Sequence, residues 1–194
     1  RPAPAVEPGG GARVWGKFVG GETQSDIYNN SAPNGGGISV PGGTLILNGS
    51  DVQGNQATGA QGTGGGIHVY DSGVLTMTGN VWVYEGQAYD GAGIYADAAT
   101  VYMGSSATVL RDNVATHHGG GLYLTAGSRL TASDGKIGDA YANAGNEAVL
   151  GAGLYTISST VNFAGSIINN IASNAGAGLY VNSSVITLTN ARVG

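Results

Sequence analysis

A glycine-rich segment that precedes a short apolar stretch recurs six times along the chain and constrains its fold more than any other feature. Each copy reads Gly-Gly-Gly or Gly-Ala-Gly before Ile or Leu. The third glycines set the phase of the repeat and lie 29, 27, 28, 32 and 25 residues apart: Gly37, Gly66, Gly93, Gly121, Gly153 and Gly178. Self-similarity at this period is typical of a protein built from stacked repeats.

Each repeat contains three segments that read as short β-strands. The first follows the glycines, as in ISV, IHV and LYL, and the second is an alternating stretch such as TLILNGS or VLTMTGN. The third is an apolar residue with Asn three positions later, as in Val52 and Asn55. Short strands separated by turn residues at this period predict one coil of a parallel β-solenoid. No window keeps apolar residues at helical spacing for more than a turn, so a helical repeat is excluded.

Six repeats and a partial one upstream predict an all-β parallel β-helix (solenoid) of about six to seven coils, each with three short strands. Residues 21–194 belong to this solenoid, and residues 1–20, rich in Pro and Gly, are predicted to be an N-terminal arm or cap. The end of an uncapped solenoid exposes backbone donors and acceptors. We therefore expect the last coil to be covered by further chain, by another chain, or by end-to-end self-association.

Charge and composition narrow the range of partners. The net charge is -5 and the seven basic residues form no cluster, so we do not expect nucleic-acid binding. The absence of cysteine excludes disulfides and thiolate metal sites. No apolar run approaches the roughly 18 residues of a membrane span, so no membrane insertion by this segment is expected. No motif indicates a bound cofactor.

The glycine triplets before Ile or Leu, combined with one apolar-x-x-Asn motif per coil, resemble the repeats of the polymorphic outer-membrane proteins. More broadly, they are similar to the right-handed parallel β-helix repeats of autotransporter passengers and surface adhesins. The similarity extends from about Ile27 to Gly194, although this chain has GGG or GAG where that family favours GGA. The resemblance implies a right-handed coil, a secreted or cell-surface location, and an adhesin-like rod that contacts host or environmental glycans or surface proteins.

One outward column of the first strand is predicted to be aromatic. Between the two inward residues of that strand, successive coils place Ser39, His68, Tyr95, Tyr123, Tyr155 and Tyr180. Sugars stack on aromatic rings through their C–H faces, and tyrosine hydroxyls supply hydrogen bonds. The ligand-binding residues are therefore predicted to be His68, Tyr95, Tyr123, Tyr155 and Tyr180. The structural alternative is that aromatic pairs between coils stabilise only the sheet.

The recurring asparagines have a predicted structural role. Stacked coil on coil, they are expected to form a ladder of side-chain amides that satisfies turn carbonyls and amides. Its members are Asn30, Asn55, Asn113 and Asn170, and two units place Gly86 and Ala140 where Asn is expected.

The adjacent His117 and His118 are the other feature that draws attention as a site. Successive residues of a strand point to opposite faces, so in regular structure the pair cannot share a metal ion. In a turn they could share one, but only together with carboxylates or another His from neighbouring coils. Stacking places His118 beside Asp90, because each directly precedes its glycine triplet. Zinc sites normally use three or four ligands, and the chain has one other histidine. Two solvated turn histidines, and no metal site, are therefore expected.

Pectate-lyase-like enzymes share the predicted architecture and use acidic calcium ligands with a basic residue on the outer face. By that analogy the candidates are Asp90, Asp97, Asp112, Asp134 and Asp139, with Arg111, Arg129 or Lys136. Their spacing shows no dedicated cluster, and neighbouring Arg and Asp residues usually form a solvated pair. The leading hypothesis is therefore a non-enzymatic rod. The alternatives are a carbohydrate-active enzyme, either a polysaccharide lyase or a glycoside hydrolase, and a structural spacer or filament subunit.

Overall fold

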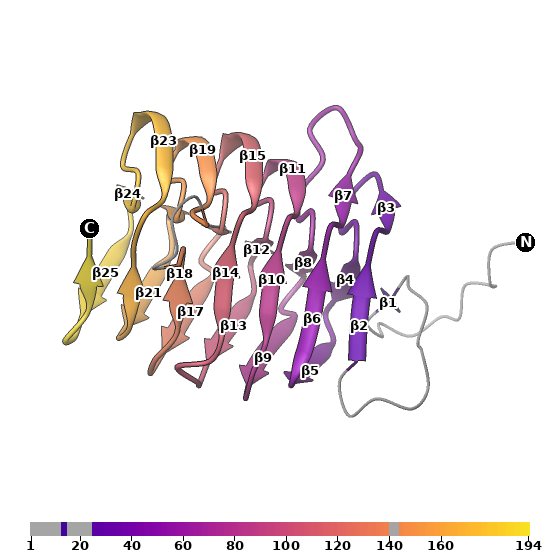
Figure 1. Cartoon of the computed structure of the whole chain (residues 1–194), viewed down its shortest axis with the longest axis horizontal. Helices are drawn as coiled ribbons and strands as arrows, with labels where there is room; N and C mark the ends of the chain where they lie inside the picture. The colour runs from indigo at the N-terminus through magenta and orange to yellow at the C-terminus, as the bar shows by residue number, and fades with distance from the viewer. Residues whose placement is uncertain (1–12, 15–24, 140–143) are drawn as a thin grey trace, which may run out of the picture.

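The chain folds into an all-β parallel solenoid of about six turns, which confirms the predicted fold class (Figure 1). The computed structural model describes residues 13–14, 25–139 and 144–194. Most of the predicted arm at 1–20 lies outside these residues, as does Ala140. Within the arm, β1 (Arg13–Val14) pairs antiparallel with the first strand of the solenoid face, β4 (Ile38–Pro41).

Each full coil contributes one strand to each of four sheets, so the prediction of three strands per coil is wrong by one. After β1 and β4, sheet A contains β8 (Ile67–Tyr70), β12 (Ile94–Asp97), β16 (Leu122–Thr125), β20 (Leu154–Ile157) and β24 (Leu179–Asn182). Sheet D contains β5 (Thr44–Asn48), β9 (Val74–Thr78), β13 (Thr100–Met103), β17 (Arg129–Ala132), β21 (Thr160–Phe163) and β25 (Val185–Leu188).

The chain then passes through the other two sheets before it reaches the next glycine triplet. Sheet B contains β2 (Ser25–Tyr28), β6 (Ser50–Gln53), β10 (Trp82–Tyr84), β14 (Val109–Arg111), β18 (Lys136–Ile137), β22 (Ser166–Ile167) and β26 (Arg192–Val193). Sheet C, the sheet that sequence analysis missed, contains β3 (Ser31–Ala32), β7 (Gln56–Ala57), β11 (Gln87–Asp90), β15 (Val114–His118), β19 (Glu147–Leu150) and β23 (Ile171–Ala175).

The register between coils follows the repeat. Ile67 pairs with Ile94, and Ile94 pairs with Leu122, so identical positions of successive units lie side by side. The hydrogen bonds between coils continue through the glycine triplets, where the N–H of Gly93 donates to the Gly120 carbonyl at 2.8 Å. The backbone of the triplet is therefore part of the ladder that joins the coils.

The third glycine of each triplet is required by the closeness of the next coil. A Cβ atom on Gly93 would lie 2.5 Å from the Gly121 carbonyl oxygen and 2.9 Å from Nδ2 of Asn113. The first glycine is required for a different reason, its backbone conformation. Gly91 has a φ of +61°, which costs a residue with a Cβ roughly 1–2 kcal/mol. Ala92 between them is fully buried and belongs to a cluster of alanines in the interior.

Two apolar clusters fill the interior. The larger contains the aliphatic residues that alternate inward on sheets A, B and D, together with Met77, Met103 and Phe163. The smaller consists of alanines, mainly from sheet C and the glycine triplets: Ala57, Ala88, Ala92, Ala115, Ala148 and Ala152. Sheet C therefore packs closely against the triplet backbone through methyl groups. In the last coil Val181 and Leu188, at inward positions of the repeat, are exposed because no further coil packs on them in this structure.

Candidate functional site

The asparagine ladder runs along the corner between sheets B and C. The Nδ2 atoms of Asn30, Asn113 and Asn146 each donate to the Oδ1 atom of the asparagine in the next coil, at 2.8–3.0 Å. From Asn55 onward, each amide also donates to the carbonyl of the apolar residue in the preceding coil, at 2.8–3.0 Å. Gly86 takes the position in one coil, and its N–H donates to Oδ1 of Asn113 at 2.9 Å.

Asn146 is a member of this ladder that sequence analysis missed. It is fully buried and lies between Asn113 and Asn170. It comes nine residues after Ile137, whereas the other asparagines follow their apolar residue by three. The six additional residues include 140–143, outside the described part of the chain. A spacing of three residues after the apolar residue therefore predicted the ladder position at Ala140 in this coil.

The stripe of His68, Tyr95, Tyr123, Tyr155 and Tyr180 occupies paired positions on the outer side of sheet A. The tyrosine rings stack on one another along the solenoid, with centroids 4.8, 4.8 and 5.2 Å apart and interplanar angles of 17°, 19° and 3°. His68 meets Tyr95 edge-on at 5.1 Å. The structure thus brings together all five residues predicted as ligand-binding.

Stacking determines which part of each ring is available. Neighbouring rings cover the faces of Tyr123 and Tyr155, and Tyr155 is only 6% exposed. His118 also stacks on Tyr155, with centroids 4.5 Å apart. Ring edges and hydroxyl groups therefore face the solvent along most of the stripe, instead of the ring faces on which a sugar would stack.

Burial changes the acid–base behaviour of the stripe. It lowers the pKa of His68 to about 4, with the Asp71 carboxylate acting in the opposite direction. It raises the pKa of Tyr95 to about 12, with smaller contributions from the Asp97 and Asp90 carboxylates. Burial also raises the pKa of Tyr123. His68 and the hydroxyls of Tyr95 and Tyr123 are therefore uncharged at neutral pH, so a ligand at this part of the stripe meets hydrogen-bonding groups instead of charges.

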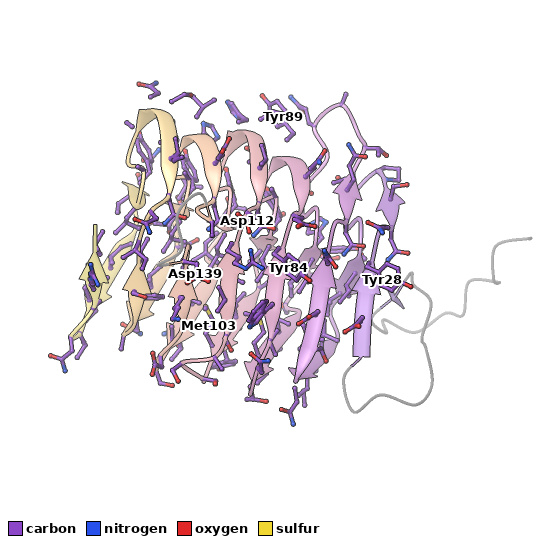
Figure 2. The ribbon with its side chains drawn as sticks, viewed as in Figure 1. Tyr28, Tyr84, Tyr89, Met103, Asp112 and Asp139 are labelled. Carbon is purple, nitrogen blue, oxygen red and sulfur yellow. The ribbon has the colours of Figure 1, made fainter. Side chains whose placement is uncertain are left out.

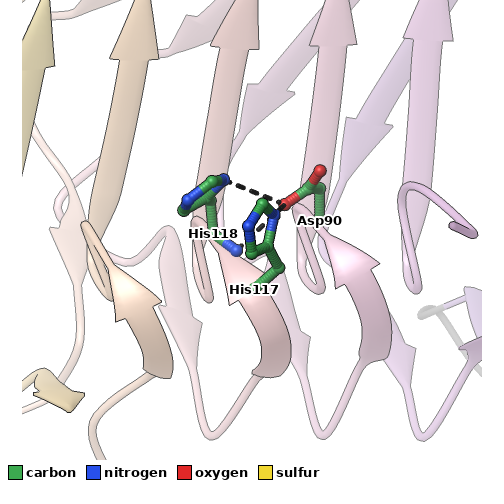
Figure 3. Close-up of side chains that lie close together, drawn as sticks. All are labelled: Asp90, His117 and His118. Atoms are coloured by element: carbon green, nitrogen blue, oxygen red, sulfur yellow. Dashed lines mark hydrogen bonds and ion pairs between the residues drawn. The ribbon is translucent and has the colours of Figure 1, made fainter. Parts of the chain in front are cut away.

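A second group, Asp90, His117 and His118, lies beside the stripe on sheet C (Figure 3). Strand β15 pairs with β11 through Ala115 with Ala88 and then His118 with Asp90. Between these pairs, two residues of β15, Thr116 and His117, thus oppose the single residue Tyr89 of β11, which is the signature of a β-bulge. The bulge turns both histidines toward one carboxylate. The sequence argument that they point to opposite faces is therefore wrong, because it assumed a regular strand.

Several polar atoms converge on the Asp90 carboxylate. Its Oδ1 atom lies 3.2 Å from Nδ1 of His117 and 3.4 Å from Nδ1 of His118, and it accepts the His118 backbone N–H at 2.9 Å. The predicted proximity of His118 to Asp90 is confirmed. His117 is 39% exposed, whereas the side chains of His118 and Asp90 are 14% and 17% exposed. Burial and the neighbouring His117 lower the pKa of His118, against the effect of Asp90.

Sheet B carries a third group, which sequence analysis missed. Trp82 and Tyr84 lie on one strand, and Arg111 pairs with Tyr84 from the next coil. The guanidinium carbon of Arg111 lies 5.1 Å from the Trp82 ring centroid and 4.8 Å from that of Tyr84, which is cation–π geometry. Arg111 also forms an ion pair with Asp112. The alternation Trp-Val-Tyr, together with Arg one repeat after Tyr84, was the signal available in the sequence.

The acidic residues considered for an enzyme are distributed over several parts of the coil. Asp97 ends a strand of sheet A, whereas Asp134 lies in the turn between β17 and β18. Leu110 and Ile137 pair with each other between neighbouring coils. Asp112 follows Leu110 by two positions and Asp139 follows Ile137 by two, so the two carboxylates lie at equivalent corners of neighbouring coils (Figure 2). In the described part of the chain, only one group has three or more His, Asp or Glu residues whose ligand atoms all lie within 4.8 Å of one another. It consists of Asp90, His117 and His118.

Comparison with known proteins finds no matching family model, no similar curated protein and no similar solved structure. In the part of the chain that the structure describes, no helix is long and apolar enough to cross a membrane.

Proposed function

We propose that this chain is a binding and structural rod of a secreted or cell-surface protein, and that it contacts an extended glycan through the aromatic stripe. The observation that carries the proposal is the continuous row of stacked tyrosines on the outer side of sheet A. The resemblance of the repeats to adhesin and autotransporter solenoids supports the location. The proposal treats the rod as a binding module instead of an enzyme.

The stripe suits a long polar ligand for a geometric reason. Its hydroxyls recur with the spacing of the coils, roughly 4.8 Å, along one line. A hydroxyl both donates and accepts a hydrogen bond, as do the hydroxyls of sugars. Within the described part of the chain, the hydroxyls of Tyr95, Tyr123 and Tyr180 form no hydrogen bond with another side chain, so they are available to a ligand. A polymer lying parallel to the solenoid axis would contact several coils at once, and the individually weak contacts would add.

The decisive experiment removes hydroxyls without removing rings. Tyr123→Phe combined with Tyr180→Phe keeps the stacked column and deletes two of its outward hydrogen-bonding groups. Binding to a glycan array and to insoluble polysaccharides is measured for the parent chain and the variant. We expect roughly a 5- to 150-fold loss of affinity for any glycan bound, because each of the two hydrogen bonds contributes about 0.5–1.5 kcal/mol. Alanine variants are less suitable, because Tyr155 and its neighbours pack against one another.

Tyr102→Phe provides the matched control, since Tyr102 is an exposed tyrosine on sheet D, outside the stripe. This variant should bind as the parent chain does. Equal binding by all three proteins, with circular dichroism showing the same fold, would refute a role for the stripe. Absence of binding to any glycan would refute the proposed ligand class.

The corner beside Arg111 favours a second candidate, a carbohydrate-active enzyme. Trp82, Tyr84 and Arg111 form an aromatic and basic surface, and Asp112 and Asp139 stand on neighbouring coils next to it. Aromatic rings, a cation and carboxylates are the groups that polysaccharide lyases and glycoside hydrolases combine. Release of reducing ends or unsaturated products from a panel of polysaccharides would support this candidate. If the corner beside Arg111 is responsible, the Asp112→Asn variant should form no product.

A further inference from the structure

We propose that Asp90, His117 and His118 form a binding site for a divalent transition-metal ion of the zinc type. At least one coordination position would remain for water or an outside ligand. The proposal does not rest on glycan binding, because its three ligands lie on a different sheet from the stripe.

The chemistry of the three ligands selects the class of ion. Two imidazole nitrogens and one carboxylate oxygen are typical ligands of Zn²⁺ and related ions of the first transition series. Ca²⁺ and Mg²⁺ prefer six or more oxygen ligands, which this group does not offer. The chain has no cysteine, so the soft thiolate ligands that favour Cu(I) are absent from it.

The distances between ligand atoms suit a single ion. Oδ1 of Asp90 lies 3.2 Å from Nδ1 of His117 and 3.4 Å from Nδ1 of His118, and one ligand atom of each residue lies within 4.8 Å of the others. Zinc at roughly 2.0–2.2 Å from each of its ligands holds neighbouring tetrahedral ligands about 3.3–3.6 Å apart. Two of the three separations are therefore close to those of a bound ion, and the third, between the ring nitrogens of the two histidines, lies within 4.8 Å.

The surroundings hold the ligands in place before an ion arrives. The bulge in β15 fixes both histidines on one side, and Tyr89 stacks on the His117 ring with centroids 4.6 Å apart. Tyr155 stacks on the His118 ring at 4.5 Å. The His118 backbone N–H holds the Asp90 carboxylate. Such supporting contacts orient ligands and typically change metal affinity by about 10- to 100-fold when removed.

The two imidazole rings also lie against each other, with centroids 3.4 Å apart, so both are held close to the Asp90 carboxylate. A neutral imidazole with its proton on Nε2 presents the Nδ1 lone pair, and this is the form that binds a metal.

The three histidines of the chain provide an internal comparison for the test. Zn²⁺, added as its chloride, is titrated into ¹⁵N-labelled protein at pH 7 while long-range ¹H–¹⁵N spectra record the histidine rings. We expect the ring signals of His117 and His118 to shift together and to saturate near one equivalent, and those of His68 to stay unchanged. Calorimetry on the same samples gives the stoichiometry and affinity.

Single variants then assign the site. His117→Ala and Asp90→Asn should each weaken Zn²⁺ binding at least about tenfold, and His68→Gln should leave it unchanged. His117 is the most exposed of the three ligands, so its variant is expected to fold, as circular dichroism would verify. Unchanged affinity in His117→Ala, shifts of His68 equal to those of the pair, or no saturation at millimolar Zn²⁺ would each overturn the proposal.

Discussion

Replacing Asn146 with alanine measures how strongly the asparagine ladder holds the coils together. The Asn146 side chain is fully buried. Its Oδ1 atom accepts the backbone N–H of Asn113 at 3.2 Å and the Nδ2 group of Asn113 at 2.9 Å. Its own Nδ2 atom donates to the Leu110 carbonyl at 2.9 Å and to Oδ1 of Asn170 at 2.8 Å. Alanine removes these four hydrogen bonds at once.

The groups left behind determine the size of the effect. The Leu110 carbonyl keeps the N–H of Gly138, and Oδ1 of Asn170 keeps the backbone N–H of residue 146. Two buried donors of Asn113, its backbone N–H and one Nδ2 hydrogen, lose their acceptor. An unsatisfied buried group costs about 1–3 kcal/mol, so the free energy of unfolding should fall by about 2–6 kcal/mol.

Urea denaturation followed by circular dichroism measures this loss, with Asn30→Ala as the matched control. Asn30 is half-buried at the end of the ladder, and without its side chain Oδ1 of Asn55 still accepts the backbone N–H of residue 30. The control should lose about 1 kcal/mol. A loss below about 1 kcal/mol for Asn146→Ala, or equal losses in both variants, would refute the reasoning by showing that the freed donors find other acceptors.

Two further predictions concern pH and the glycine triplet. Because the pKa of His68 falls from its usual 6.5 to about 4 on folding, the unfolded chain binds more protons between these values. Stability should therefore fall by up to about 3 kcal/mol as the pH drops from 6.5 to 4, and His68→Gln should remove that part of the slope in urea titrations. A slope that is identical in the two proteins would contradict the assignment. Gly93→Ala places a Cβ 2.5 Å from the Gly121 carbonyl and should lower the thermal midpoint strongly, whereas Gly104→Ala, whose Cβ meets nothing closer than 3.8 Å, should change it little. Similar midpoints for these two variants would argue against a steric role for the triplet.

The parallel solenoid was predictable because its signals recur in every coil. The third glycine marks where one coil approaches the next, and a large apolar residue follows it. Residues at the same position of successive repeats are therefore the ones that pair between strands. Sheet C was missed because its inward residues are alanines such as Ala88 and Ala115, which give no contrast with the polar residues beside them. Strand recognition depended on large side chains, and this sheet packs closely without them.

The candidate sites were predictable only in part. The repeat placed the tyrosines in one column, but it contained no information on side-chain rotation, which decides whether ring faces or ring edges meet the solvent. His117 and His118 were assigned to opposite faces because alternation was assumed, and a bulge of one residue leaves no distinct mark in a single sequence. Asn146 was displaced by an insertion. Local departures from the repeat therefore carry the features that the repeat cannot predict.

The hydrogen bonds that join successive coils all run along the long axis of the solenoid, with the first and last strands at opposite ends (Figure 1). Tension applied between those ends would load the bonds of a terminal coil directly, and coils would detach one after another from the ends. Each detached coil would free 25 to 32 residues, set by the spacing of the third glycines. At about 3.3–3.6 Å per extended residue, each step lengthens the chain by roughly 80–115 Å. The repeat length that sets the fold would thereby also set the length of each extension step.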